Sequence, residues 1–263
     1  FMHHYNFPPF STGEVRGLRS TGRREIGHGF LAKKALERVL PPEEEFPYTV
    51  RLVSEVLQAN ASTSMAAVCG STLALMDAGV PIKAPVAGIS IGMIEDEASP
   101  KLLVDLEAIE DFMGGMDLKI AGTRQGVNCV QMDTKTQGVS LDVLAEGLQL
   151  AREARLQVLD VMAEAIPYPR PELSRYAPRM VSISINRDQI GLIIGPGGKN
   201  IRRMQEEYEV NIDVEDDGTV LIFGTNPDGV EAARQAIYDL TRTVEVGEVF
   251  DGTVTSTTDF GAF

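Results

Sequence analysis

The sequence predicts an α+β protein in which a mixed core is followed by two smaller units. Short stretches rich in apolar and β-branched residues, typical of buried strands, recur along 84–134. Longer stretches with apolar residues at helical spacing accompany them, the longest at 141–166. A run containing Pro169 and Pro171 then interrupts the pattern, and a second series of strands and helices follows it. We therefore expect three domains, at 1–178, 179–244 and 245–263.

The composition excludes several classes of protein. With 43% hydrophobic residues, and with 25 glycines and 14 prolines among 263 residues, the chain can form packed cores and is not globally disordered. It has no apolar run of the roughly 18 residues that a membrane span needs, and its first residues lack the pattern of a signal peptide. Two cysteines, Cys69 and Cys129, cannot form a disulfide framework, so we expect reduced thiols and a cytoplasmic location.

Charge is distributed unevenly along the chain. The net charge of −14 argues against a protein that coats nucleic acid indiscriminately, because phosphate binding requires local lysine and arginine. Basic residues are nevertheless concentrated at 14–38, and acidic residues at 94–117. We expect the first region to attract anions and the second to hold a cation.

The elements of the first domain follow from periodicity and from helix-breaking residues. Residues 1–24 contain Pro8, Pro9 and three glycines, which predict loops and turns. The hydroxyl-rich segment 60–64 and Gly79 predict the start and the end of a helix over 60–79. The remaining helices are expected at 24–40 and 141–166, and the strands at 48–57, 84–94, 102–106, 117–122 and 127–134.

The second domain has the predicted order β-α-α-β-β-α. Its first strand is followed by a short helix, a glycine-rich loop and a longer helix, and a turn at 216–218 separates its last two strands. The strands are expected at 180–185, 210–214 and 219–223, and the longer helices at 200–208 and 228–244.

The glycine-rich loop at 195–199 fits one of three phosphate-binding patterns. An NTPase loop requires glycine where Ile193 stands, and a dinucleotide fingerprint requires glycine where Asn200 stands, so both patterns fail. A clamp formed by Gly195 and Gly198 between two short helices fits, because glycine lets the backbone approach a sugar-phosphate chain. Together with the order of strands and helices, this loop resembles that of a KH domain, which binds single-stranded RNA.

The interior of the clamp carries no positive charge, since its two middle residues are Pro196 and Gly197. The attraction for phosphate would therefore depend on Lys199, Arg202 and Arg203 in the helix that follows. We expect this domain to contribute modest affinity rather than sequence discrimination.

The last segment, 245–263, resembles the opening strands of an OB barrel of the ribosomal-protein type. Its three phenylalanines, Phe250, Phe260 and Phe263, would include an aromatic platform on which bases stack. Core packing is the alternative role for these side chains.

Two carboxylates and an amine suggest a metal site in the first domain. Asp117 and Lys119 lie two residues apart on a predicted strand and therefore share a face, and we expect Asp111 to fold back from the preceding loop through Gly114 and Gly115. Mg²⁺ typically takes one or two carboxylates and leaves positions for water and substrate phosphates. A surface acidic loop with a salt-bridged lysine is the alternative.

Two further elements point to anion binding. Thr63 and Ser64 stand at the start of a predicted helix, where free backbone N–H groups and the helix dipole favour an anion, although ordinary helix capping also explains one hydroxyl. Arg23 and Arg24 form a pair that is suited to bidentate phosphate contacts. His28, close behind them, is either a structural histidine or a substrate contact.

With these elements the chain resembles the C-terminal half of the bacterial polynucleotide phosphorylases. The segments that carry the resemblance are 5–9, 23–29, 73–81 and 116–119, together with the KH clamp and the start of the OB barrel. The resemblance implies a second RNase PH core with the two-domain fold of ribosomal protein S5, missing its opening strands, followed by a KH domain and a truncated OB domain. It also implies a homotrimeric ring around an RNA channel, and RNA-decay proteins as partners.

The resemblance further implies roles for individual residues. The expected reaction is processive 3′-to-5′ phosphorolysis of single-stranded RNA by inorganic phosphate, which releases nucleoside diphosphates, and its reversal. Asp111 and Asp117 would bind Mg²⁺, or Mn²⁺ in its place, and Lys119 would stabilise the charged transition state. Thr63, where the family usually has serine, and Ser64 would bind phosphate. The expected RNA contacts are Arg23, Arg24, His28, Gly195, Gly198, Lys199 and Arg202.

Two other functions remain open at this point. A non-catalytic RNA-binding subunit of such a ring would be favoured by loss of the carboxylates or of the anion site, and neither is lost. A hydrolytic nuclease would release monophosphates and would need no added phosphate.

Overall fold

A computed structural model describes the whole chain except residues 18–19, 44, 97–98, 244–245 and 250. The chain divides into two compact units, Phe1–Ser174 and Arg175–Phe263. The boundary at Ser174 lies close to the one expected after residue 178, and the boundary expected at 244–245 falls outside the described residues. No described helix is both long and apolar enough to cross a membrane.

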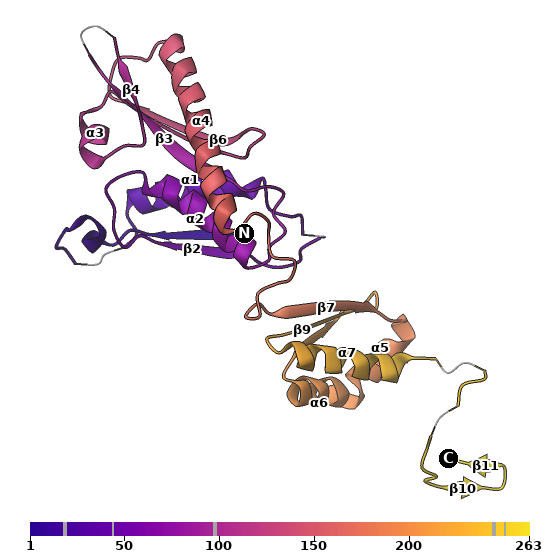
Figure 1. Cartoon of the computed structure of the whole chain (residues 1–263). Helices are drawn as coiled ribbons and strands as arrows, with labels where there is room; N and C mark the ends of the chain where they lie inside the picture. The colour runs from indigo at the N-terminus through magenta and orange to yellow at the C-terminus, as the bar shows by residue number, and fades with distance from the viewer. Residues whose placement is uncertain (18–19, 44, 97–98, 244–245, 250) are drawn as a thin grey trace. The chain divides into compact units, whose positions relative to one another are not determined.

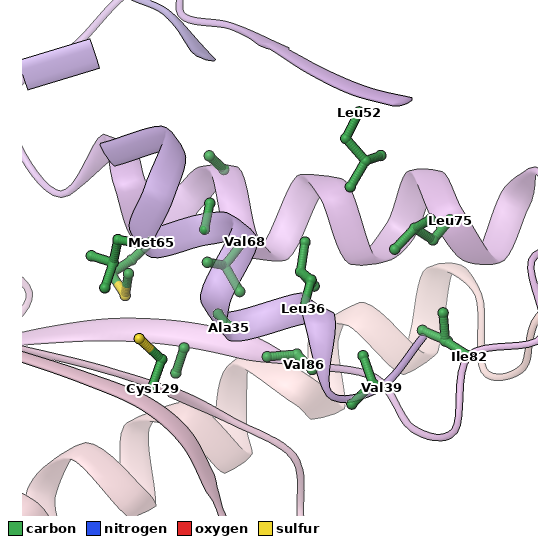
Figure 2. Close-up of a cluster of buried hydrophobic side chains, with 14 of the residues drawn as sticks. Ala35, Leu36, Val39, Leu52, Met65, Val68, Leu75, Ile82, Val86 and Cys129 are labelled. Carbon is green, nitrogen blue, oxygen red and sulfur yellow. The ribbon is translucent and has the colours of Figure 1, made fainter. Parts of the chain in front are cut away.

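The first half of unit 1 packs two helices against a pair of parallel strands. Strand β1 (Met2–Asn6) pairs along its length with β2 (Arg51–Glu55), and the 3₁₀ helix η1 (Pro9–Thr12) follows β1. Helices α1 (Arg23–Glu37) and α2 (Thr63–Asp77) contact each other and these strands. Figure 2 shows the shared core, to which α1 contributes Leu36 and α2 contributes Val68 and Leu75, all fully or almost fully buried.

The second half of unit 1 is a four-stranded antiparallel sheet in the order β4-β3-β5-β6. Its elements are β3 (Ala87–Ile94), β4 (Lys101–Val104), α3 (Ala108–Met113), β5 (Met116–Gly122), β6 (Val127–Thr134) and α4 (Leu141–Ala165). Helix α4 runs along one face of the sheet (Figure 1), where Ala151 packs with Ile91, Leu118 and Ile120. Because side chains alternate along a strand, this burial leaves Asp117 and Lys119 on the opposite face of β5.

The structure corrects two expectations in this unit. Residues 1–24 are not all loops and turns, because 2–6 form β1, a short strand that exists through its pairing with β2. Asp111 does not lie on a loop but in α3, which begins with a capping box between Glu107 and Glu110. Both Cys69 and Cys129 are free thiols, as expected.

Unit 2 has the predicted β-α-α-β-β-α order around a three-stranded sheet in the order β7-β9-β8. Its elements are β7 (Arg179–Ser184), η2 (Arg187–Gln189), α5 (Ile190–Ile194), η3 (Pro196–Gly198), α6 (Lys199–Tyr208), β8 (Asn211–Val214), β9 (Thr219–Gly224) and α7 (Pro227–Thr241). Helices α5, α6 and α7 place Ile193, Met204 and Ile237 in one core with Ile222 of the sheet.

The chain ends with a short antiparallel hairpin of β10 (Thr257–Thr258) and β11 (Gly261–Ala262). The rings of Phe260 and Phe263 lie edge to face, 6.1 Å apart, and both are largely exposed. Phe250 lies outside the described residues. An OB barrel at this end of the chain stays a prediction.

Candidate active site

A cavity of about 150 Å³ lies in unit 1 at the N-terminal ends of α1 and α2, facing β5 and α3. It brings together six of the residues singled out in the sequence, which come from four elements, α1, α2, α3 and β5. These residues are Arg24, His28, Thr63, Asp111, Asp117 and Lys119.

Asp117 and Lys119 form a buried ion pair on β5. The Lys119 ammonium donates to Oδ2 of Asp117, and both side chains are largely buried. Oδ1 of Asp117 is also buried and has no hydrogen-bond partner among the described residues. Burial raises the pKa of Asp117, while Lys119 opposes that rise. One carboxylate oxygen therefore remains available for a further ligand.

Asp111 supplies the second carboxylate from α3. Its Oδ1 lies 3.6 Å from Nζ of Lys135, and the Lys135 ammonium also donates to the Asp111 carbonyl oxygen. The negative charge of Asp111 contributes to the raised pKa of Asp117, as expected for carboxylates that face the same space. The described residues contain no group of three His, Cys, Asp or Glu side chains arranged to hold a metal.

The two carboxylates fit Mg²⁺ better than a metal that requires a complete protein cage. Mg²⁺ commonly uses one or two carboxylates and completes its shell with water and substrate phosphates. The buried Oδ1 of Asp117, which lacks a partner among the described residues, is the observation that supports this fit.

The three hydroxyl groups at the start of α2 lie in different environments. Ala61 and Ser62 both have positive φ, at 138° and 50°, and this turn directs Ser62 toward Ser90, whose Oγ lies 2.6 Å away. Thr63 lines the cavity. Ser64 does not line it; the residue is fully buried, and its Oγ has no hydrogen-bond partner in the described structure. Of the two residues expected to bind phosphate, the structure therefore places Thr63 at the cavity and Ser64 behind it.

The two neighbouring arginines also have different environments. Arg24 lines the cavity, and its guanidinium lies 5.4 Å from the centre of the Phe7 ring. Arg23 instead lines a neighbouring hollow with Arg16 and Thr21. A single bidentate site built from both arginines is therefore not present in this arrangement.

His28 takes part in a hydrogen-bond chain with two other side chains. Its Nδ1 lies 3.2 Å from the hydroxyl of Tyr5, which donates to Oγ1 of Thr63 over 2.7 Å. Burial, followed by the charges of Lys119 and Arg24, lowers the pKa of His28 to about 4. The imidazole is therefore neutral at pH 7.

Tyr5 and Phe7 have no role in the site that the sequence predicts, and Asn60 belongs to the predicted anion-binding start of α2 without a role of its own. Phe7 and Asn60 line the cavity, and Tyr5, only 4% exposed, supports Thr63 from behind. The segment 5–9 stood out as a motif, but nothing local to it indicates that β1 ends at the cavity.

The expected RNA contacts of unit 2 lie on its glycine-rich loop. Gly195, Gly197 and Gly198 all have positive φ, which glycine adopts without strain. Arg202 turns back onto this loop and donates to the carbonyl oxygens of Gly197 and Gly198, while Lys199 is exposed at the start of α6.

Comparison with protein families assigns a type to each part of the chain. Residues 1–81 match domain 1 of the 3′ exoribonuclease family, and residues 84–154 match domain 2. Residues 180–239 match the KH domain, which confirms the resemblance of the glycine-rich loop.

Curated relatives are similar along the whole chain. Proteins named polyribonucleotide nucleotidyltransferase from Rubrobacter xylanophilus and Moorella thermoacetica are each 56% identical over 263 residues, and one from Thermus thermophilus is 55% identical. All of this chain is covered in each case. The chain spans 38%, 35% and 37% of the length of these three relatives, respectively.

Proposed function

Because the chain belongs to the 3′ exoribonuclease family, we propose that it forms part of a phosphorolytic enzyme that degrades single-stranded RNA from the 3′ end. The observation that carries this proposal is the cavity in which two carboxylates and an ammonium group face the first turn of α2. Positive and hydrogen-bond-donating groups beside a carboxylate pair are suited to phosphoryl transfer, which depends on positioning and charge neutralisation.

In the proposed reaction, an oxygen of inorganic phosphate attacks the phosphorus of the last phosphodiester bond. The bond between that phosphorus and O3′ of the preceding nucleotide breaks, O3′ takes up a proton, and a nucleoside diphosphate leaves. In the reverse direction, the RNA 3′ hydroxyl attacks a nucleoside diphosphate and releases phosphate.

The side chains of the cavity have distinct roles in this proposal. Lys119 places its ammonium beside the reacting phosphoryl group, and Arg24 binds phosphate oxygens or the RNA backbone. The hydroxyl of Thr63 accepts from Tyr5, which leaves its own proton free to donate to a phosphate oxygen. Asp111 and Asp117 would hold Mg²⁺, or Mn²⁺, which supplies neutralisation of the phosphate charges when it is bound.

The wider proposal concerns the RNA and the assembly. The KH domain and the terminal segment would hold the RNA that extends from the cavity, which favours processive degradation. Homotrimer formation, a cytoplasmic location and association with RNA-decay proteins complete the proposal, as the family resemblance implies.

The test is a product assay with the full-length protein, a single-stranded RNA and Mg²⁺, with and without inorganic phosphate. We expect nucleoside diphosphates that appear only when phosphate is present, and a decrease of at least 100-fold for Asp117→Asn. Asp142→Asn is the matched control, because Asp142 is exposed in the first turn of α4 and does not line the cavity.

Three outcomes would contradict parts of the proposal. Activity of Asp117→Asn within threefold of the wild type would exclude the metal assignment. Monophosphates formed without phosphate would indicate a hydrolase. RNA binding without any product, in a protein shown to be trimeric, would indicate a non-catalytic ring subunit.

A further inference from the structure

The hydrogen-bond chain from His28 to Thr63 determines which nitrogen of His28 carries a proton. Tyr5 has a single O–H group, and this group donates to Oγ1 of Thr63 over 2.7 Å. The hydroxyl oxygen of Tyr5 is therefore left as an acceptor toward Nδ1 of His28, 3.2 Å away. A hydrogen bond at this position requires the proton of a neutral imidazole to be on Nδ1.

The other ring nitrogen, Nε2, is then an acceptor. His28 is neutral at pH 7, because burial and the nearby charges of Lys119 and Arg24 lower its pKa to about 4. Nε2 has no hydrogen-bond partner among the described residues, and His28 lines the cavity. His3 differs in this respect, because both of its ring nitrogens have partners inside the fold, Gly29 and Ser54. His28 thus has an unused lone pair at the cavity.

An unused acceptor selects a particular part of the substrate. The cations Arg24 and Lys119, and the free proton of Thr63, are donors suited to phosphate oxygens. A phosphodiester has no proton to give to Nε2. Inorganic phosphate carries one as HPO4²⁻, but the proposed reaction transfers that proton to O3′, so it is not a lasting partner for Nε2. At the 3′ end of an RNA, the groups that donate are the ribose hydroxyls and the amino and ring N–H groups of the bases. The hydroxyls occupy the same positions on every nucleotide, whereas the base donors differ in number and position from one base to the next.

We propose that Nε2 of His28 accepts a hydrogen bond from a ribose hydroxyl of the 3′-terminal nucleotide, and that Tyr5 is the positioning residue that holds His28 in the tautomer required for this. The inference rests on the proposed function, since it assigns part of the RNA substrate to the same cavity. It makes His28 a specificity residue, because a 2′ hydroxyl is the group by which a protein distinguishes RNA from DNA.

The kinetic test compares three oligonucleotides with the full-length protein: an RNA, the same RNA with a 2′-deoxy terminal nucleotide, and the same RNA with a 3′-deoxy terminal nucleotide. For the wild type, kcat/KM is expected to fall roughly tenfold on one deoxy substrate, since a hydrogen bond to a buried acceptor is lost. For His28→Phe, which keeps a planar ring but has no acceptor, the ratio of kcat/KM on RNA to kcat/KM on that deoxy substrate is expected to fall below about twofold.

Tyr5→Phe is expected to lower this ratio partially, because Tyr5 no longer imposes the tautomer of His28. His4 is exposed on β1, the strand that also contains Tyr5, and His4→Gln is the control that should retain the wild-type ratio.

A second measurement does not depend on activity. In the full-length protein labelled with ¹⁵N-histidine, the signals absent from His28→Phe belong to His28. We expect a protonated Nδ1 and an unprotonated Nε2 at pH 7, and a mixture of tautomers in Tyr5→Phe.

The outcomes separate this inference from the proposed function. A wild type that releases no nucleoside diphosphate in the presence of phosphate contradicts the proposed function itself. A wild type that releases them, but whose discrimination against both deoxy substrates is unchanged in His28→Phe, overturns the role of His28 alone. A proton on Nε2, or an effect of His28→Phe that depends on which base stands at the 3′ end, also overturns it.

Discussion

Lys119 donates to one carboxylate oxygen of Asp117 from two residues along the same strand, and the other oxygen of Asp117 is buried with no hydrogen-bond partner in the described structure. Side-chain exposure is only 12% for Lys119 and 8% for Asp117, so water stabilises neither charge well. The pair therefore has a structural cost, since desolvation offsets much of the attraction between buried charges.

Removal of Lys119 alone should destabilise the protein. Lys119→Met leaves a buried carboxylate without its partner, which we expect to lower the free energy of unfolding by about 3 kcal/mol. The double variant Lys119→Met/Asp117→Leu replaces the pair with apolar side chains and should recover stability to within about 1 kcal/mol of the wild type. Urea unfolding of the two single variants and the double variant measures this cycle. Additive losses would show that the two side chains are not coupled.

Stability should decrease in acid because of His28. Its pKa in the folded protein is about 4, below the ordinary value of 6.5, so the unfolded chain binds more protons between these two values. The contribution of His28 to stability is therefore complete above about pH 6.5 and decreases as the pH falls toward 4. We expect a loss of about 2 kcal/mol, allowing for the partial exposure of the ring.

The measurement is the unfolding midpoint from pH 7 to pH 4 for the wild type and for His28→Gln. The variant has no imidazole at this position, so its stability should decrease less over this range. His4→Gln is the control on an exposed histidine of β1. Parallel curves for the wild type and His28→Gln would show that the imidazole is not held neutral.

Gly79 should tolerate no side chain. It follows the end of α2 with φ of 81°, and a Cβ there would collide with the carbonyl oxygen of Glu172 and lie 2.9 Å from Cα of Leu173. Backbone strain and overpacking together predict a loss of about 3 kcal/mol for Gly79→Ala. Gly70→Ala is the matched control inside α2, where the added methyl group meets nothing within 4 Å and should stabilise the helix by about 0.5–1 kcal/mol. Thermal unfolding that lowers the midpoint equally for both variants would contradict this explanation.

RNA binding by the KH loop should depend on the charge of the side chain at position 197 rather than on its size. Gly197 has φ of 61° and ψ of 23°, a conformation that Asp and Asn both adopt, and a Cβ there meets nothing within 4 Å. Gly197→Asp places a carboxylate where RNA phosphates are expected and should weaken binding of a long single-stranded RNA by about tenfold. Gly197→Asn, of nearly the same shape but neutral, should weaken it by less than about threefold. Equal losses, measured by titration in the absence of phosphate, would mean that the loop acts through its shape alone.

Much of the fold could be predicted because it depends on local patterns. Helix α4 has Ser140 as its N-cap, accepting from the backbone N–H of Val143, and an amphipathic stretch that covers the sheet. The order of strands and helices in unit 2 was predicted correctly because turns such as 216–218 separate short alternating segments. Strand β1 was missed, since its five residues become a strand only through pairing with β2, about fifty positions away.

The candidate site was predictable by residue type but not by placement. Neighbouring residues with the same chemistry, such as Arg23 and Arg24, have different environments, because successive side chains on a helix point in different directions. Thr63 and Ser64 also have different environments, because Thr63 lines the cavity and the Ser64 hydroxyl is buried. Tyr5 could not be predicted, since its role depends on two partners in other elements.

The sequence by itself determined the division into an RNase PH-like core and a KH domain, together with the carboxylates, the amine and the hydroxyl groups available for chemistry. Periodicity, breakers and short motifs encode these features locally. The tertiary structure alone decided which of those groups meet at one cavity, that Nδ1 of His28 meets the hydroxyl of Tyr5, and which oxygen of Asp117 has no partner among the described residues. These properties depend on burial and on hydrogen bonds between residues far apart along the chain, which no local pattern specifies.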